Sequence, residues 1–271
     1  MTLELTYNGE TNIPVEIEGI NPDTIQSLSN AEIEKLPVFH GKEKCVVGDF
    51  FKVSGDAADL HMLLSGTLTG VHWIGTKMEA GQITIEGDCG RHLGSEMRGG
   101  SITVNGNAGD WIGAEMKGGL IHVHGDGGHQ VGAAYRGSAR GMNRGTIIID
   151  GNAGNEIGLT MRRGLIVIGG NAGDLIGFNM LAGTIMVFGE SGIRHGAGMR
   201  RGSIIFMSES HPKLLPSFRH AVRYQPEFMQ VLLRKITATG FEIAQPILDS
   251  NFDLYHGDMI DGGRGEILLR V

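Results

Sequence analysis

The chain has 271 residues, of which 41% are hydrophobic and 20% charged, and this is enough for a sizeable core. A formal net charge of −7 argues against binding to nucleic acid or to anionic membranes. The two cysteines give no disulfide framework and no zinc spacing, and neither a signal peptide nor a membrane-spanning run of ~20 apolar residues is visible, so we expect a cytoplasmic chain.

Residues 1–45 are predicted to form an N-terminal cap. The stretch LELTYNGETNIPVEI (3–17) predicts a hairpin with Asn8 and Gly9 at its turn. Ser29 and Glu32 have the spacing of a capping box, which indicates a short helix after Ser29. Two irregular strands are expected within 49–56 and 63–70.

Residues 46–207 are dominated by a repeat. Glycines recur in steps of 19 residues, with a single step of 26, at Gly81, Gly100, Gly119, Gly145, Gly164, Gly183 and Gly202. Every unit carries an alternating apolar pair such as Ile102 and Val104, which predicts a short strand with one buried face. Such a strand cannot bury its face alone, but copies stacked about 4.8 Å apart can. The sequence therefore predicts a mainly β fold, a single-stranded parallel β-helix of about seven regular 19-residue coils.

The repeat also assigns structural roles. Methionines recur in the same steps and predict a stacked row in the core, while the slot of Cys89 is always small, so we interpret Cys89 as a structural thiol. Trp111 lies in a variable column, aligned with His92, Gln130, Glu156, Leu175 and His195, and this suggests an outward corner that could contact a partner. The 26-residue step contains the insertion AAYRGSARG (133–141).

The outward strand positions turn from polar to apolar along the chain. Such an apolar face must be covered either by segment 208–271 or by another subunit, and the sequence leaves both options open. The candidate interface residues are Trp111, Tyr135, Arg136, Leu165, Val167, Met186 and Phe188. Segment 208–271 is predicted to be a C-terminal cap, with a helix within 226–240 and a strand within 265–271.

A basic row follows the methionines. It consists of Arg98, Lys117, Arg144, Arg162, Arg163, Arg200 and Arg201. The favoured interpretation is a solvated corner row balanced by Glu96 and Glu115, and the alternative is a docking strip for an acidic partner or a polyanionic ligand.

No catalytic constellation is apparent. His122 and His124 have a spacing that can chelate a metal, but only Asp150 could supply a third donor and it would lie next to one histidine alone, so we expect no metal on this chain. A solitary enzyme that uses both histidines with a metal is the competing hypothesis from another class.

Several segments carry a family resemblance. The stretch EIEKLPVFHGKEKCVVGDFFKVSGD, the repeats, YRGSARGM, HPKLLPSF and YHGDMIDGGRGEILLR resemble the C subunit of formylmethanofuran dehydrogenase, and more closely the C subunit of the formyltransferase/hydrolase complex of methylotrophs. The repeat is shared with the C-terminal domain of the glutamate synthase large subunit, so a stand-alone domain of that type is an alternative. The resemblance implies a right-handed β-helix.

The resemblance also implies a non-catalytic structural subunit of a hetero-oligomer. Formyl transfer from tetrahydromethanopterin to a furan-type C1 carrier would belong to the D subunit, which is a formyltransferase. Hydrolysis to formate would belong to the zinc-dependent, amidohydrolase-like A subunit, and the B subunit would be a further partner. In the archaeal dehydrogenase, a tungsten or molybdenum pterin would lie on another subunit. The glutamate-rich tail of the carrier would be a ligand for the basic row. No catalytic residue and no cofactor is expected on this chain.

Overall fold

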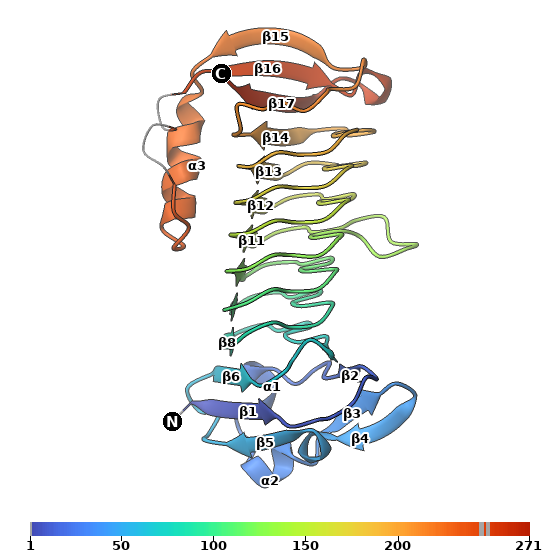
Figure 1. Cartoon of the computed structure of the whole chain (residues 1–271), viewed down its shortest axis with the longest axis vertical. Helices are drawn as coiled ribbons and strands as arrows, with labels where there is room; N and C mark the ends of the chain where they lie inside the picture. The colour runs from blue at the N-terminus through green and yellow to red at the C-terminus, as the bar shows by residue number, and fades with distance from the viewer. Residues whose placement is uncertain (1, 244–246, 248–249) are drawn as a thin grey trace.

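The computed structural model describes residues 2–243, 247 and 250–271, and these residues form a mainly β molecule (Figure 1). Within that part of the chain, a 13-stranded sheet extends along the molecule and a four-stranded sheet lies at its N-terminal end. The middle of the long sheet is a ladder of strands that each come from one repeat. These strands are β8 (Gln82–Ile85), β9 (Ser101–Val104), β10 (Leu120–Val123), β11 (Thr146–Ile149), β12 (Leu165–Ile168), β13 (Thr184–Val187) and β14 (Gly202–Phe206).

Neighbouring strands of the ladder pair in parallel and in register. Ile83 lies opposite Ile102, and Ile102 lies opposite Ile121. Isolated bridges at a second corner, such as Cys89 with Ala108, repeat the same spacing. The prediction of a mainly β chain with a large, mostly parallel sheet is therefore confirmed, and the arrangement is β-helix-like.

The inward face of the ladder is the main core. Ile102, Val104 and Ile121 have no exposed surface. The repeating methionines are equally buried: Met78, Met97, Met116, Met142, Met161, Met180 and Met199. Burial of each such side chain contributes about 1.5–3 kcal/mol, which favours the regular stack. Glycine is required at the corners, because Gly113 has a φ of +60° and a Cβ there would collide with Cδ1 of Ile147.

The N-terminal strands do not form the predicted hairpin. Strand β1 (Leu3–Tyr7) belongs to the long sheet, whereas β2 (Val15–Glu16) belongs to the small one. The alternating side chains of β1 extend the core, and its two partners are β6 in parallel and β5 in antiparallel. The other strands of this region are β3 (Pro37–His40), β4 (Glu43–Val46), β5 (Phe51–Ser54), β6 (His61–Ser65) and β7 (Val71–His72).

The predicted capping box is confirmed. Helix α2 (Asn30–Ile33) begins after Ser29, whose backbone N–H donates to Glu32 Oε2 at 2.8 Å. A second short helix, α1 (Pro22–Ile25), and a 3-10 turn, η1 (Val47–Asp49), lie in the same region.

The C-terminal segment closes the other end of the sheet. Strand β17 (Gly265–Arg270) pairs in parallel with β14, and β16 (Phe252–Gly257) and β15 (Arg219–Tyr224) follow in antiparallel. The turn η3 (Met259–Asp261) joins β16 to β17, and helix α3 (Glu227–Thr237) follows β15. The predicted final strand and the predicted helix within 226–240 are both confirmed. The domain boundaries at residues 45 and 207 stay a prediction.

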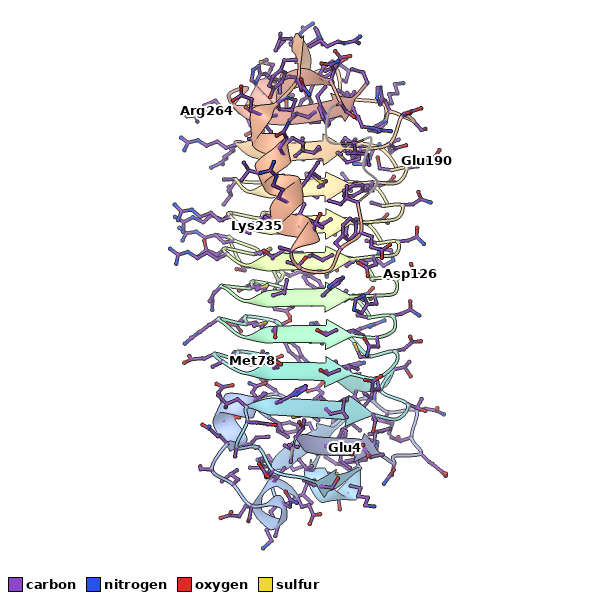
Figure 2. The ribbon with its side chains drawn as sticks, turned by 90° about the vertical axis from the view of Figure 1, so that its left-hand side faces the viewer. Glu4, Met78, Asp126, Glu190, Lys235 and Arg264 are labelled. Atoms are coloured by element: carbon purple, nitrogen blue, oxygen red, sulfur yellow. The ribbon has the colours of Figure 1, made fainter. Side chains whose placement is uncertain are left out.

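Helix α3 lies against the outward face of the ladder (Figures 1 and 2). Its buried side chains Met229, Leu233 and Ile236 share a second core with the strands. From the ladder, this second core takes Ile148, Leu165, Val167, Met186 and Ile205, together with Met207 directly after β14. Of the two ways left open for covering the apolar face, the structure shows the first, in which the chain's own C-terminal segment covers it.

Candidate functional site

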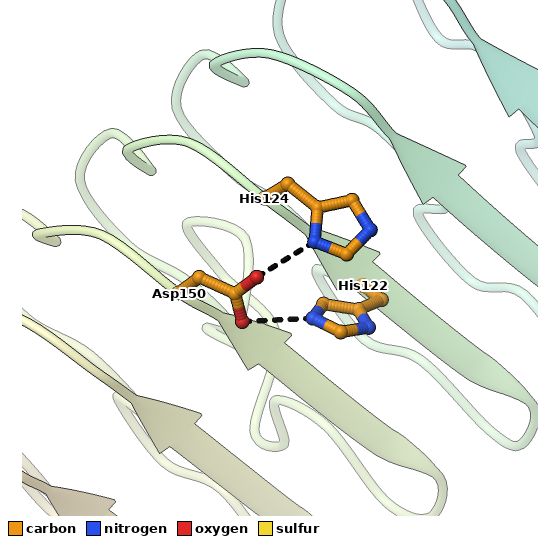
Figure 3. Close-up of side chains that lie close together, drawn as sticks. All are labelled: His122, His124 and Asp150. Atoms are coloured by element: carbon orange, nitrogen blue, oxygen red, sulfur yellow. Dashed lines mark hydrogen bonds and ion pairs between the residues drawn. The ribbon is translucent and has the colours of Figure 1, made fainter. Parts of the chain in front are cut away.

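Two histidines and one aspartate meet on the outward face beside the second core (Figure 3). His122 Nε2 lies 2.8 Å from Asp150 Oδ1, and His124 Nδ1 lies 2.7 Å from Asp150 Oδ2. The three candidate donor atoms all lie within 4.8 Å of one another. In the part of the chain that the structure describes, this is the one group of three histidine, cysteine or carboxylate ligands with that proximity.

The register of β10 and β11 explains the cluster. His122 is paired with Ile148 and Val123 with Ile149, so the next positions, His124 and Asp150, lie side by side where both strands end. The imidazoles of His122 and His124 project from the same face because side chains alternate along a strand. Their exposures differ: the side chain of His122 is 6% exposed, that of His124 44% and that of Asp150 32%.

A cavity of about 580 Å³ opens next to the cluster. Its lining includes His124 and Asp150, the rings of Phe188 and Phe241, and the side chains of Glu242 and Ile247.

The position next to Asp150 in the ladder is Gly169, and its lack of a side chain keeps this space open. A Cβ on Gly169 would collide with the backbone oxygen of Asp150 and lie 3.0 Å from Cε2 of Phe241. Gly240 lies close to His122: a Cβ at this glycine would be 3.9 Å from His122 Cε1. The cluster therefore has one buried imidazole and one side that faces an open cavity.

The sequence singled out both histidines but did not predict that Asp150 contacts both of them. It placed this carboxylate beside one histidine, whereas in the structure Asp150 contacts both. The signal was present in the 26-residue step, which aligns His124 with Asp150 once the insertion is removed.

The basic row is neutralised only at its N-terminal end. Arg98 pairs with Glu79 at 2.7 Å and Lys117 with Glu96 at 3.0 Å. Glu115, expected to balance the row, instead accepts a hydrogen bond from the Tyr135 backbone N–H. Across the described residues, no carboxylate lies within ion-pair distance of the remaining members, Arg144, Arg162, Arg163, Arg200 and Arg201. The positive charge of the row therefore gathers beside the later coils.

Trp111 belongs to an aromatic cluster that the sequence did not reveal. Its ring stacks on Tyr135 at 4.9 Å between centroids, and His92 stacks on Trp73 at 4.0 Å. The Tyr135 hydroxyl lies 2.9 Å from His92 Nδ1 and 2.8 Å from Ser95 Oγ. The insertion thus folds back onto its own coils, and Trp111 is half-buried rather than freely exposed.

Burial shifts the titration of this cluster. It is the main cause that lowers the pKa of His92 to about 4, and charge repulsion from neighbouring His72 and Arg91 acts in the same direction. Burial also raises the pKa of Tyr135 to about 12. Both side chains are therefore neutral at pH 7.

One alignment made from the sequence was wrong. The last member of the Trp111 column is Arg194, not His195, because Arg194 has the φ of 63° that characterises this corner. His195 points inward and is 1% exposed.

The apolar candidates for a partner interface are covered by the chain itself. Leu165, Val167 and Met186 are buried in the second core. Phe188 is partly buried, with its ring 5.1 Å from that of Phe241. Trp111 and Tyr135 are half-buried and Arg136 is exposed, so these three stay candidates for contact with a partner.

A family model for the GXGXG motif matches residues 59–253. This range takes in the whole ladder from β6 to β14. The chain belongs to the GXGXG family.

This GXGXG chain is similar to the C subunits of formylmethanofuran dehydrogenases. It is 39% identical over 88 residues to the C subunit of the tungsten-containing enzyme 2 of Methanothermobacter thermautotrophicus, and 42% identical over 94 residues to the C subunit of its molybdenum-containing enzyme 1. The matches cover 31% and 34% of this chain and 33% and 24% of the relatives, so they span a third or less of the relatives' length.

A solved structure matches the GXGXG chain from end to end. It is a chain in the crystal structure of the formyltransferase/hydrolase complex from Methylorubrum extorquens in complex with methylofuran. The TM-score is 0.91 at 33% identity, with 99% of both chains covered. The resemblance stated from the sequence is confirmed. Among the described residues of this family member, none of the helices combines the length and the apolar character needed to traverse a membrane.

Proposed function

We propose that this chain is the structural C subunit of an assembly of the formyltransferase/hydrolase type. Such an assembly would move a formyl group from tetrahydromethanopterin to a furan-type C1 carrier and hydrolyse it to formate. The observation that carries this proposal is the end-to-end match, since 99% of this chain aligns with 99% of a chain from that complex. In that role the chain would be a right-handed β-helix of about seven regular coils that acts in the cytoplasm.

The reaction itself would take place on partner subunits. We expect three of them, namely the zinc-dependent, amidohydrolase-like A subunit, the B subunit and the formyltransferase D subunit, and we expect the C1 carrier to be bound by them. The contribution of this chain would be its shape and its surface. The uncompensated part of the basic row and the exposed Arg136 on the insertion are the surfaces that we propose for contacts with partners or with an acidic carrier tail.

Affinity purification of the tagged full chain from its natural host tests the assembly. We expect subunits of the amidohydrolase and formyltransferase types to co-purify with the tagged chain. Arg136→Glu should lower their yield, because it reverses an exposed charge on the insertion. Lys42→Glu is the matched control at the N-terminal end, where an equally exposed charge is reversed. A chain that purifies alone, with formyl-transferring or hydrolytic activity of its own, would refute the proposal.

The second candidate is the C subunit of an archaeal-type dehydrogenase. It is favoured by the curated relatives, which are C subunits of tungsten-containing and molybdenum-containing formylmethanofuran dehydrogenases. Elemental analysis of the purified assembly separates the two candidates. Tungsten or molybdenum in the assembly would indicate the dehydrogenase, and formyl transfer with zinc but neither of those metals would indicate the formyltransferase/hydrolase.

A further inference from the structure

We propose that His122, His124 and Asp150 form a binding site for one Zn²⁺ ion on this chain, with a coordination position open to the adjacent cavity. The sequence led us to expect no metal here, because it did not bring a third donor to both histidines. The structure supplies that donor, since the two oxygens of Asp150 each face one imidazole (Figure 3).

The donor set fits zinc. Imidazole nitrogens and a carboxylate oxygen bind Zn²⁺ at about 2.0–2.2 Å, and three protein ligands with a fourth position left to water are typical of zinc sites that bind exogenous groups. Hard cations such as Mg²⁺ and Ca²⁺ prefer an all-oxygen shell, so two imidazoles disfavour them.

The three donors must rearrange to share one ion. Two ligands on a tetrahedral zinc ion lie about 3.3 Å apart, as follows from the bond lengths above. The two nitrogen–oxygen distances, each to a different oxygen of Asp150, are 2.8 and 2.7 Å, and all three donor atoms lie within 4.8 Å of one another, so they must shift by up to about 1.5 Å. His124 and Asp150 are partly exposed and can adjust, while the buried His122 gives the site a fixed point.

The position of the site favours an open shell rather than a closed structural one. His124 and Asp150 line a cavity of about 580 Å³, and Gly169 leaves the neighbouring ladder position without a side chain. Glu242, a further carboxylate, lines the same cavity. A water molecule on the open position would thus face a space bounded by the rings of Phe188 and Phe241 and by this carboxylate.

The backbone positions the three ligands before any metal arrives. His122 lies on β10, and His124 and Asp150 directly follow β10 and β11, which pair in register. Ligands held on paired strands lose little conformational freedom on binding, which favours affinity. This proposal does not rest on the proposed assembly, because it concerns only residues of this chain.

Zinc titration of the chelator-treated full chain by calorimetry tests the site. We expect one Zn²⁺ bound per chain, and Co²⁺ in place of zinc should give visible absorption bands of a four- or five-coordinate site with nitrogen and oxygen ligands. Asp150→Asn keeps the shape of the side chain but removes the charge. It should weaken binding by more than about 100-fold, since even the loss of an outer hydrogen-bond partner costs 10–100-fold.

Two further variants keep the result interpretable. His124→Ala changes a partly exposed side chain and should also abolish binding, so it serves if Asp150→Asn fails to fold. His220→Ala is the matched control, because it removes an imidazole that contacts a single carboxylate, Asp253, at 3.3 Å, and should leave the titration unchanged. The proposal is overturned if the unmodified chain binds no zinc, or if Asp150→Asn and His124→Ala bind it as tightly as the unmodified chain does.

Discussion

A left-handed backbone corner recurs in each coil and is occupied by residues other than glycine. Their φ values lie between 60° and 68°, at Trp73, His92, Trp111, Gln130, Glu156, Leu175 and Arg194. This conformation costs a residue with a Cβ roughly 1–2 kcal/mol. The backbone of the adjacent coil offsets the cost, because the N–H of Trp111 donates to the carbonyl of His129 at 2.9 Å. Since the backbone holds the corner, its side chain can vary, and this explains the mixed chemistry of the column.

The lowered pKa of His92, which belongs to this column, predicts that the free energy of unfolding falls in mild acid. Its pKa is lowered to about 4 in the folded chain, mainly by burial, against about 6.5 in an unfolded one. The unfolded chain therefore binds the extra proton first, and the contribution of neutral His92 is lost as the pH falls from 6.5 towards 4. Melting temperatures across this range should fall less steeply for His92→Asn, because asparagine tolerates the left-handed corner and does not titrate there. Parallel curves for the two proteins would contradict this assignment.

At the residue scale, the features that recur with the 19-residue period could be predicted from the sequence. The buried methionines and the structural thiol Cys89, whose pKa burial raises to about 12, follow directly from the period. The meeting of Asp150 with both histidines could not be predicted, since it depends on rotamers that reach diagonally across two strands. A polar ladder was also missed: the Asp88 carboxylate accepts from the N–H of Asn107 at 2.7 Å, and the Asn107 side chain accepts from the N–H of Asp126 at 2.7 Å.

Helix α3 is the element that keeps the apolar outward face out of water. Three of its side chains are at most 2% exposed, while Val231 on the opposite side is 70% exposed. Apolar contacts of this kind hold the helix against the ladder, so it should detach before the ladder unfolds.

We therefore expect Leu233→Ala to free the helix locally. Loss of a buried leucine costs about 2–5 kcal/mol, and the free energy of opening α3 should fall by that amount. Amide exchange across 227–237 should quicken, while exchange in the ladder strands stays unchanged. Val231→Ala is the matched control and should leave both regions as they are. Equal acceleration of exchange in the ladder would show that helix and ladder unfold as one unit.

At the element scale, local patterns and remote pairings differ in how well they can be predicted. The helix within 226–240 and the final strand were both predicted from single local stretches of sequence. The hairpin within 3–17 was wrong because β1 finds partners more than 40 residues away, and no local turn signal reveals them. That α3 covers the ladder was one of two options, since an apolar face does not say what covers it.

The molecule as a whole is a regular stack with one irregularity, the insertion after β10. The coil closes around it as in other coils, because the Met142 N–H donates to the Gly132 carbonyl at 2.8 Å, just as Met116 donates to Gly113 at 3.1 Å. The insertion is therefore an addition to the coil rather than a break in it.

Deletion of residues 134–140 should consequently leave the stack folded, because it restores the 19-residue step. The chain loses the aromatic contacts of Tyr135, worth about 0.5–1.5 kcal/mol each, and the melting temperature should drop by only a few degrees. The emission of Trp73 and Trp111, the two tryptophans of the chain, should shift to longer wavelengths as Tyr135 no longer covers them. Tyr135→Phe keeps the ring and should preserve the emission. An insoluble deletion variant would show that the insertion is needed for folding.

The edge strand β15 affects whether the sheet can pair with the sheet of a second copy of the chain. A parallel stack with open ends could accept a coil from a second copy, and repetition of that step would give a filament. Strand β15 instead runs antiparallel to β16, its register shifts between His220 and Val222, and Arg219 and Arg223 are exposed along it. These are features by which natural sheets avoid joining edge to edge. At this end of the sheet, a repeat that could in principle be extended by a second copy is therefore stopped by a strand that belongs to the chain itself.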